Sequence, residues 1–240
     1  MPDSKSLTIP RRDWWAVGFS LVLPTAVTVV YFILLAGAPA AWQQGAYVVG
    51  KLLQFGFPLV WFWYVQRRRI AWRGPRWREL FDGGLLGAAI VVAMLLLYFG
   101  WLKDAFPPEA LARIRQKTQG IGVGTGARFA ALGVFYAVGH SLLEEYYWRW
   151  FVFGQLRALT AFSVAAVVSA VGFMAHHVCV LADYFGWMSP LTLFLSASVA
   201  IGGLLWAGLY QRHQSLYGVW LSHLLVDAGI FWVGYDLLMR

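Results

Sequence analysis

The chain has 240 residues, of which 60% are hydrophobic and only 12% are charged, and its mean hydropathy is +0.62. Soluble domains carry about 25% charged residues, so this composition excludes an ordinary soluble globular protein. The net charge of +8 does not indicate a nucleic-acid partner, because the basic residues cluster between apolar segments, as in "QRRRIAWRGPRWR" (66–78). That placement fits loops that face anionic lipid headgroups. Cys179 is the only cysteine, which excludes an intrachain disulfide and a cysteine metal cluster.

Seven stretches are long enough to cross a membrane, since a spanning helix needs about 20 mainly apolar residues. They are 14–36, 46–66, 82–102, 128–157, 161–181, 191–210 and 216–238. The first exceeds the apolar core of a secretory signal, about 7–15 residues, and we interpret it as an uncleaved span. The sequence therefore predicts an all-α polytopic membrane protein, with residues 1–240 forming a single membrane domain.

One sizeable polar segment, 103–127, interrupts these spans. Within it "PPEALARIRQKTQ" (107–119) predicts a short amphipathic helix at the membrane surface. The "GIGVGTG" run (120–126) that follows lacks the Lys-Ser/Thr ending of a phosphate loop. We therefore expect a flexible hinge there and no nucleotide site.

The orientation of the chain follows from the Lys and Arg residues in short loops, which favour the cytoplasmic side. With the N-terminus inside, eleven basic residues would be cytoplasmic and six external. The eleven are Lys5, Arg11, Arg12, Arg67, Arg68, Arg69, Arg73, Arg76, Arg78, Arg157 and Arg212, and the six are Lys103, Arg113, Arg115, Lys117, Arg128 and Arg240. The count predicts a cytoplasmic N-terminus.

Ionisable residues inside spans are costly and usually face a protein interior or a water-filled cavity. Here they are Glu144, Glu145, Arg149, His140, His176, His177, His223 and Asp227, with Lys51 and Asp236 nearer the ends of their spans. Glu145 and Arg149 are four residues apart and share a helical face, where they can form an ion pair. Glu144 points about 100° away. One carboxylate can thus neutralise the arginine while its neighbour stays free.

The histidines lie on two further spans. His223 and Asp227 are four residues apart on the last span and share a face. Because His176 and His177 are adjacent, we expect only one of them to face a common site. His140, one turn before Glu144, is a candidate partner of that carboxylate. Counting 1.5 Å per residue from the nearest turns places Glu144, His177 and His223 at overlapping depths.

Two chemistries fit this set of residues. A carboxylate held away from water is a stronger base and can activate water together with an imidazole, while a second imidazole can donate to the oxyanion that forms when water attacks an amide. Alternatively, two His and one Glu can hold a catalytic Zn²⁺. A third interpretation is structural: Glu145–Arg149 braces a helix in a non-catalytic immunity factor, scaffold or transporter.

Three motifs within 125–238 also resemble a known family. "EEYYWR" (144–149) matches EExxxR, "FMAHH" (173–177) matches FxxxH, and "HLLVD" (223–227) matches HxxxN/D. In this order on successive late helices, the chain resembles the CAAX protease and bacteriocin-processing family of intramembrane endopeptidases, which includes the CAAX prenyl proteases.

The resemblance implies a role for each matching residue. Glu144 would be the general base, acting with His177 on the hydrolytic water. Glu145 would be held by Arg149, and His223 with Asp227 would stabilise the oxyanion. The family pattern favours Asn at position 227, and Asp lacks the amide donor, so Asp227 would act as a protonated carboxyl or by orienting His223. The family often has Gly after the arginine, where this chain has Trp150.

The resemblance further implies a glutamate-type enzyme without a cofactor, with zinc the less favoured alternative. The substrate would be a membrane-associated protein or peptide, cut in a C-terminal or signal-like segment, and nothing in the sequence selects a lipidated cysteine. We expect an integral protein of a bacterial plasma membrane.

Overall fold

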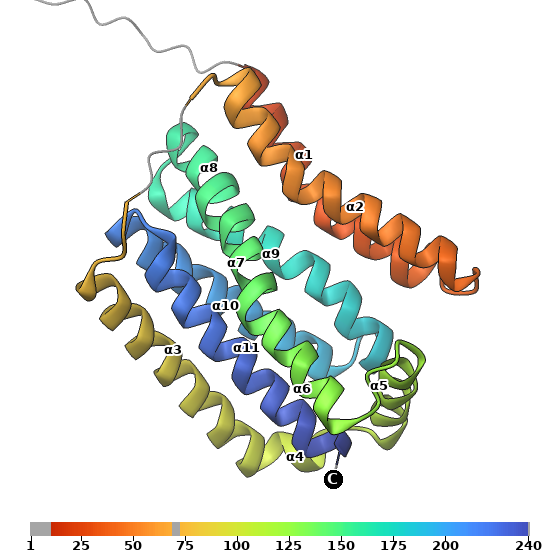
Figure 1. The fold of residues 1–240 in the computed structure, drawn as a ribbon. Helices are drawn as coiled ribbons and strands as arrows, with labels where there is room; N and C mark the ends of the chain where they lie inside the picture. The colour runs from red at the N-terminus through yellow and green to blue at the C-terminus, as the bar shows by residue number, and fades with distance from the viewer. Residues whose placement is uncertain (1–10, 69–72, 240) are drawn as a thin grey trace, which may run out of the picture.

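The computed structural model describes residues 11–68 and 73–239, and in that part of the chain every regular element is helical (Figure 1). Seven helical runs there are long and apolar enough to cross a membrane, which confirms the predicted all-α polytopic membrane fold. They cover Arg11–Leu34, Ala40–Val65, Trp77–Ala105, Gly126–Leu159, Phe162–Phe185, Pro190–His213 and Leu216–Leu238. Lys5, Arg69 and Arg240, which enter the charge count for orientation, lie outside the described residues.

The helices are named as in Figure 1. Their bounds are α1 (Arg11–Val29), α2 (Ala40–Val60), α3 (Trp77–Leu97), α4 (Lys103–Ala105), α5 (Pro108–Gly120), α6 (Gly126–Val134), α7 (Ser141–Glu145), α8 (Gly154–Leu159), α9 (Phe162–Phe185), α10 (Pro190–His213) and α11 (Leu216–Met239). Wider π-helical turns connect or extend the first four spans, at Val30–Leu34, Trp61–Val65, Tyr98–Leu102, Phe135–His140 and Tyr146–Phe153. Two of these flank α7, and π turns occur frequently at functional sites.

The second span begins earlier than the sequence predicted. We expected it at 46–66, which would place Lys51 near its end, but α2 starts at Ala40. Pro39, in an extended conformation, directly precedes the helix, and "AAWQQ" (40–44) continues it. Lys51 therefore lies near the middle of the span Ala40–Val65.

Short connections make the last three spans antiparallel neighbours. Gly186 ends α9 with φ of 89°, a backbone conformation that favours glycine. Ser189 begins α10 by accepting a hydrogen bond from the Leu191 amide, and Gln214 ends that helix with φ of 50°. α11 then runs back beside α3, and the two helices lie side by side in Figure 1. Their backbones come so close that a Cβ on Gly83 would overlap the Gly218 carbonyl group.

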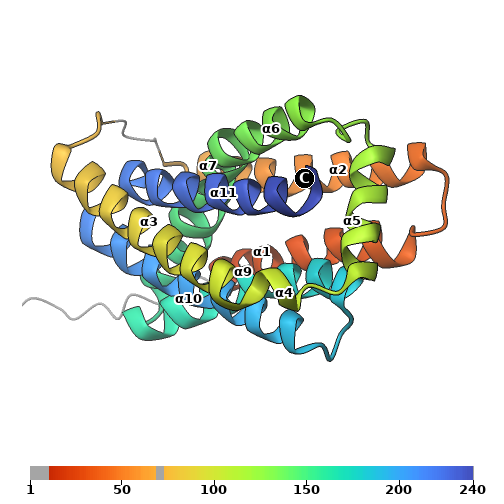
Figure 2. The ribbon, with the colours of Figure 1, turned by 90° about the horizontal axis from the view of Figure 1, so that it is seen from below.

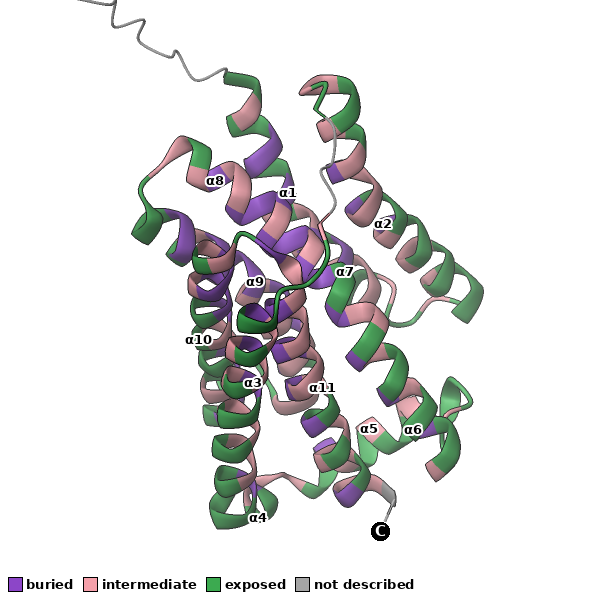
Figure 3. Cartoon of the chain, turned by 60° about the vertical axis from the view of Figure 1, so that its left-hand side comes forward, coloured by how far each residue is buried: buried purple, intermediate pink, exposed green. Residues whose placement is uncertain are grey.

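The fourth span, α6 to α8, crosses in front of the later helices in Figure 1, and its second half packs into the core of the bundle. Tyr147, Trp148, Phe151 and Val152 are buried there with residues of α1, α9 and α10. Buried residues gather where these helices face one another, whereas the outer faces are exposed, as a lipid-facing surface requires (Figure 3). Polar side chains on the inner face of α7 are therefore enclosed by protein.

The predicted amphipathic helix at 107–119 is present as α5. It crosses one end of the bundle, at a steep angle to the spans (Figure 2). The Arg113 guanidinium donates to the Asp183 carbonyl on α9, and the Arg115 guanidinium donates to the Leu237 carbonyl on α11. The Lys117 ammonium lies 4.1 Å from the Phe32 ring centroid. Its location at the membrane surface remains a prediction.

Candidate active site

Three helices bring polar side chains together in the interior. α7 supplies Glu144 and Glu145, α9 supplies His176 and His177, and α11 supplies His223. Each of these helices is apolar on its other faces, so the polar residues point inward where water or a partner can meet them. The convergence of Glu144, His177 and His223 that the sequence predicted is therefore present.

The Glu144 carboxylate lies at the centre of this cluster and is 4% exposed. Its Oε1 lies 3.6 Å from His176 Nε2. Its Oε2 lies 3.7 Å from His223 Nε2 and 3.8 Å from His140 Nδ1. Imidazoles from the π-helical turn before α7, from α9 and from α11 thus surround one carboxylate. His140, a candidate partner from its spacing, occupies the expected place.

The Glu145 carboxylate has a different environment. It is fully buried, and its Oε1 lies 3.1 Å from Arg149 Nη1, which confirms the ion pair predicted from the four-residue spacing. The same oxygen is 2.7 Å from Nδ1 of His223, close enough for that ring nitrogen to donate a hydrogen bond. Glu145 therefore links the arginine to the histidine on α11, a connection that the sequence did not reveal.

Aromatic rings hold the cationic partners in position. The Arg149 guanidinium lies 4.7 Å from the Phe173 ring centroid and 5.0 Å from that of Trp206. The Trp206 ring also stacks on His223, with centroids 4.1 Å apart. The sequence did not predict these contacts, because a lone aromatic residue in an apolar span carries no signal of them.

Both adjacent histidines of α9 reach Glu144, which corrects the expectation that only one would. Glu144, His176 and His177 each offer a ligand atom, and these atoms lie within 4.8 Å of one another. The two rings are 4.1 Å apart. His177 Nδ1 contacts the Phe173 carbonyl at 2.9 Å, and His176 stacks on Trp148.

Asp227 lies on the far side of His223. Its Oδ1 is 3.5 Å from His223 Nε2, the nitrogen that also faces Glu144. Asp227 is thus placed to orient this imidazole, one of the two roles considered for an Asp at this position. The six predicted site residues are Glu144, Glu145, Arg149, His177, His223 and Asp227, and the structure brings all of them into one connected cluster.

A metal ion would also find suitable donors here. Glu144, His176 and His177 are the His/His/carboxylate set that catalytic zinc sites use. His176 Nδ1 is buried without a hydrogen-bond partner among the described residues, so a ligand could occupy it. The donor set fits zinc.

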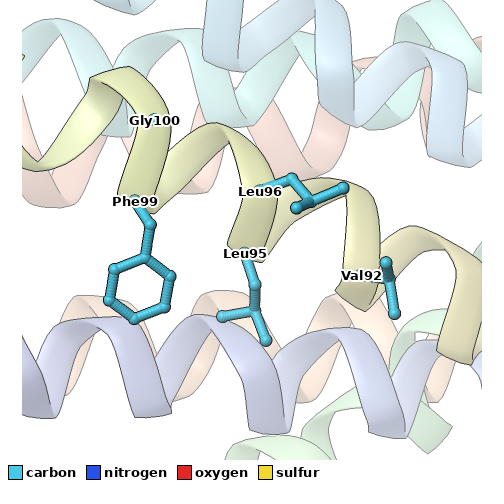
Figure 4. Close-up of a pocket in the computed structure, with 5 residues that line it drawn as sticks. All are labelled: Val92, Leu95, Leu96, Phe99 and Gly100. Atoms are coloured by element: carbon cyan, nitrogen blue, oxygen red, sulfur yellow. The ribbon is translucent and has the colours of Figure 1, made fainter.

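Two open recesses lie apart from this cluster. One recess, of about 430 Å³, lies along the span Trp77–Ala105 and has an apolar lining (Figure 4). It is lined by Val92, Leu95, Leu96, Phe99 and Gly100. The other, about 360 Å³, lies beneath α5 and is lined by Gln43, Arg113, Gln116, Lys117, Asp183 and Tyr184. Neither contains the carboxylate–imidazole combination that water activation needs.

Residues 126–229 match a family model described as "Type II CAAX prenyl endopeptidase Rce1-like". The matched segment begins at the start of α6 and ends within α11, so it contains all six predicted site residues. A search of curated proteins and a search of solved structures found no match.

Proposed function

We propose that the chain hydrolyses a peptide bond in a membrane-associated protein, because residues 126–229 match the family model of the Rce1-like type II CAAX prenyl endopeptidases. The match agrees with the CAAX protease resemblance of the three motifs and supports an intramembrane protease. Seven apolar spans make it an integral membrane protein. The catalytic mechanism, the substrate and the orientation in the membrane are part of the proposal.

Water activation by Glu144 is the central step of the proposed mechanism. The supporting observation is a carboxylate that is 4% exposed and lies 3.6–3.8 Å from three imidazoles. Glu144 takes a proton from the water, His176 and His177 orient that water, and the hydroxide attacks the scissile carbonyl. The proton then passes to the leaving amine, and the two products carry a new carboxylate and a new amine.

His223 stabilises the oxyanion in this proposal. Glu145 holds Nδ1 at 2.7 Å, so Nε2 is left to face Glu144 and Asp227. A proton on Nε2 can be donated to the negative oxygen that develops beside Glu144. Asp227 favours that protonated ring and fixes its orientation. Glu145 and Arg149 act through His223 and are positioning residues.

We propose that the enzyme works without a cofactor. If zinc is bound, Glu144, His176 and His177 would hold it, and it would supply Lewis-acid polarisation of the substrate carbonyl and of the attacking water. In either version the protein is proposed to act in a bacterial plasma membrane with its N-terminus in the cytoplasm, as the loop charges favour.

The deciding experiment replaces Glu144 by Gln, which retains the shape of the side chain and removes the base. Membrane proteins from cells with the wild-type chain and from cells with Glu144→Gln are compared by mass spectrometry of their terminal peptides. We expect cleaved products only with the wild type. Glu109→Gln, on the exposed surface of α5, is the matched control and should cleave normally. Equal product patterns for wild type and Glu144→Gln, at equal expression, would favour a non-catalytic scaffold or transporter.

A further inference from the structure

Lys51 is a cation in the middle of a membrane span. It lies 11 residues after Ala40 and 14 before Val65, which is about 16 Å and 21 Å along the helix. Its Nζ donates to Gln54 Oε1 at 3.2 Å and lies 5.5 Å from the centroids of the Tyr47 and Phe55 rings. Within the described chain no carboxylate lies at ion-pair distance. Such a charge is costly in a span and indicates a functional partner.

Gln54 provides a second donor beside Lys51. The side chain is fully buried, and its Oε1 accepts from Lys51. Its Nε2 has no hydrogen-bond partner among the residues that the structure describes. An unpaired buried amide costs about 1–3 kcal/mol, and nearly all buried polar groups are paired. One helix turn therefore carries two neighbouring donor groups, and one of them, Gln54 Nε2, has no acceptor among the described residues.

Contacts on both sides connect this turn to the candidate active site. The Tyr146 hydroxyl donates to the Phe55 carbonyl at 3.1 Å, and Tyr146 follows Glu145 directly. On the other side Tyr47 interacts with Tyr136, whose ring lies 4.7 Å from that of His140. The donors thus lie on the α2 side of the site.

We infer that Lys51, with Gln54, binds the C-terminal carboxylate of the substrate and so determines specificity for cleavage close to a free chain end. This rests on the proposed protease function. A terminal carboxylate is an anion that an otherwise apolar peptide must bring into the membrane. It accepts hydrogen bonds from an ammonium and an amide at the same time. Lipid phosphate is a poorer candidate, because Lys51 is about 16 Å from the nearer end of its span.

The test measures binding and cleavage separately. The probes are two fluorescent peptides that end in a farnesylated Cys-aliphatic-aliphatic-Met sequence and differ only in a free C-terminal carboxylate or a C-terminal amide. Binding is measured with the Glu144→Gln protein in lipid nanodiscs, where no turnover interferes. We expect the carboxylate peptide to bind roughly 10- to 100-fold more tightly, since a hydrogen bond to a charged group contributes about 1.5–3 kcal/mol.

In the Glu144→Gln protein, a second substitution, Lys51→Gln, should abolish the preference for the carboxylate peptide and leave binding of the amide peptide unchanged. Lys51→Arg should retain the preference. In the enzyme with Glu144 intact, Lys51→Gln should raise KM for the carboxylate peptide with little change in kcat. Lys117→Gln is the matched control, because Lys117 also lies over aromatic rings but is located on α5. Lys51→Met, which retains the apolar stem, replaces Lys51→Gln if that protein does not fold.

Equal binding of the two peptides, or a preference that survives Lys51→Gln and Lys51→Met, would overturn this inference. So would equal binding of an amidated peptide that carries a Glu side chain instead of the terminal carboxylate. A carboxylate preference in binding together with no cleavage by the wild type would support the anion site and contradict the protease function. Cleavage of both peptides at equal rates would support the protease function and contradict the anion site.

Discussion

Replacing each of the two adjacent carboxylates of α7 by Gln should affect different properties: stability for Glu145 and catalytic activity for Glu144. Glu145→Gln removes the charge that compensates Arg149, which lies 3.1 Å away and is 2% exposed. Breaking a buried pair by removing one partner destabilises by about 3–5 kcal/mol, because an uncompensated charge stays buried. The substitution also removes the negative acceptor of His223 Nδ1, 2.7 Å away. We therefore expect Glu145→Gln to lower the free energy of unfolding by at least about 3 kcal/mol.

Glu144→Gln should leave stability within about 1 kcal/mol of the wild type. Its ion-pair contacts are longer, 3.6–3.8 Å, and are shared among three imidazoles. Activity should fall by about 10²–10⁴-fold, the contribution of a general base. The two neighbours thus separate a stability effect from a catalytic one.

Unfolding in mixed micelles by added SDS measures the first quantity, with the fluorescence of the 14 Trp residues as the signal. Cleavage of a membrane-associated peptide measures the second. The double variant Glu145→Gln/Arg149→Met should regain most of the lost stability, because it removes the orphaned charge. Equal destabilisation by Glu144→Gln and Glu145→Gln, or no rescue by Arg149→Met, would refute the assignment of brace and base.

Three further outcomes follow from the structure. Gly83→Ala should lower the free energy of unfolding in the SDS titration by about 1–3 kcal/mol, since its Cβ would overlap the Gly218 carbonyl. Gly84→Ala is the control: its Cβ meets only Leu221, at 3.8 Å, and the substitution should be neutral or stabilising. Asp227→Asn should retain activity within about tenfold, because an amide oxygen can still accept a hydrogen bond from His223. Asp227→Leu should lose about 100-fold or more in kcat. Equal rates for the two variants would contradict an orienting role of Asp227. Exhaustive chelation with phenanthroline and dialysis should leave cleavage unchanged if no metal is required, and restoration of a lost activity by added Zn²⁺ would establish the zinc version.

The sequence predicted most of the fold because membrane spans are defined by composition. Seven apolar stretches correspond to the seven spans, since the backbone in lipid must satisfy its own hydrogen bonds within a helix. The start of α2 was predicted six residues late, because polar Gln43 and Gln44 resemble a loop in a hydropathy profile. Gln43 instead donates from its side chain to the carbonyls of Leu35, Ala36 and Ala38 and closes the turn between the first two spans.

The site could be predicted where spacing within one helix determines contact. The Glu145–Arg149 ion pair follows from four residues on one face, and so does the proximity of His223 and Asp227. The hydrogen bond between Glu145 and His223 could not be predicted, because it depends on how α11 is turned against α7. The same holds for the approach of both α9 histidines to Glu144, since rotation of a span about its axis is set by packing.

The family match begins at residue 126, and the contacts of the site give this boundary a physical meaning. The family match begins at α6 and contains the base, the brace and the imidazoles, whereas Lys51 and Gln54 lie on α2, outside it. Catalysis needs fixed distances among α7, α9 and α11, which form the buried centre of the bundle. Selection of a substrate needs only a complementary group on a helix that borders this centre, and we propose that α2 supplies it, since Tyr146 donates to the Phe55 carbonyl. Substitutions on α2 should therefore change which peptides are cleaved without changing how they are cleaved.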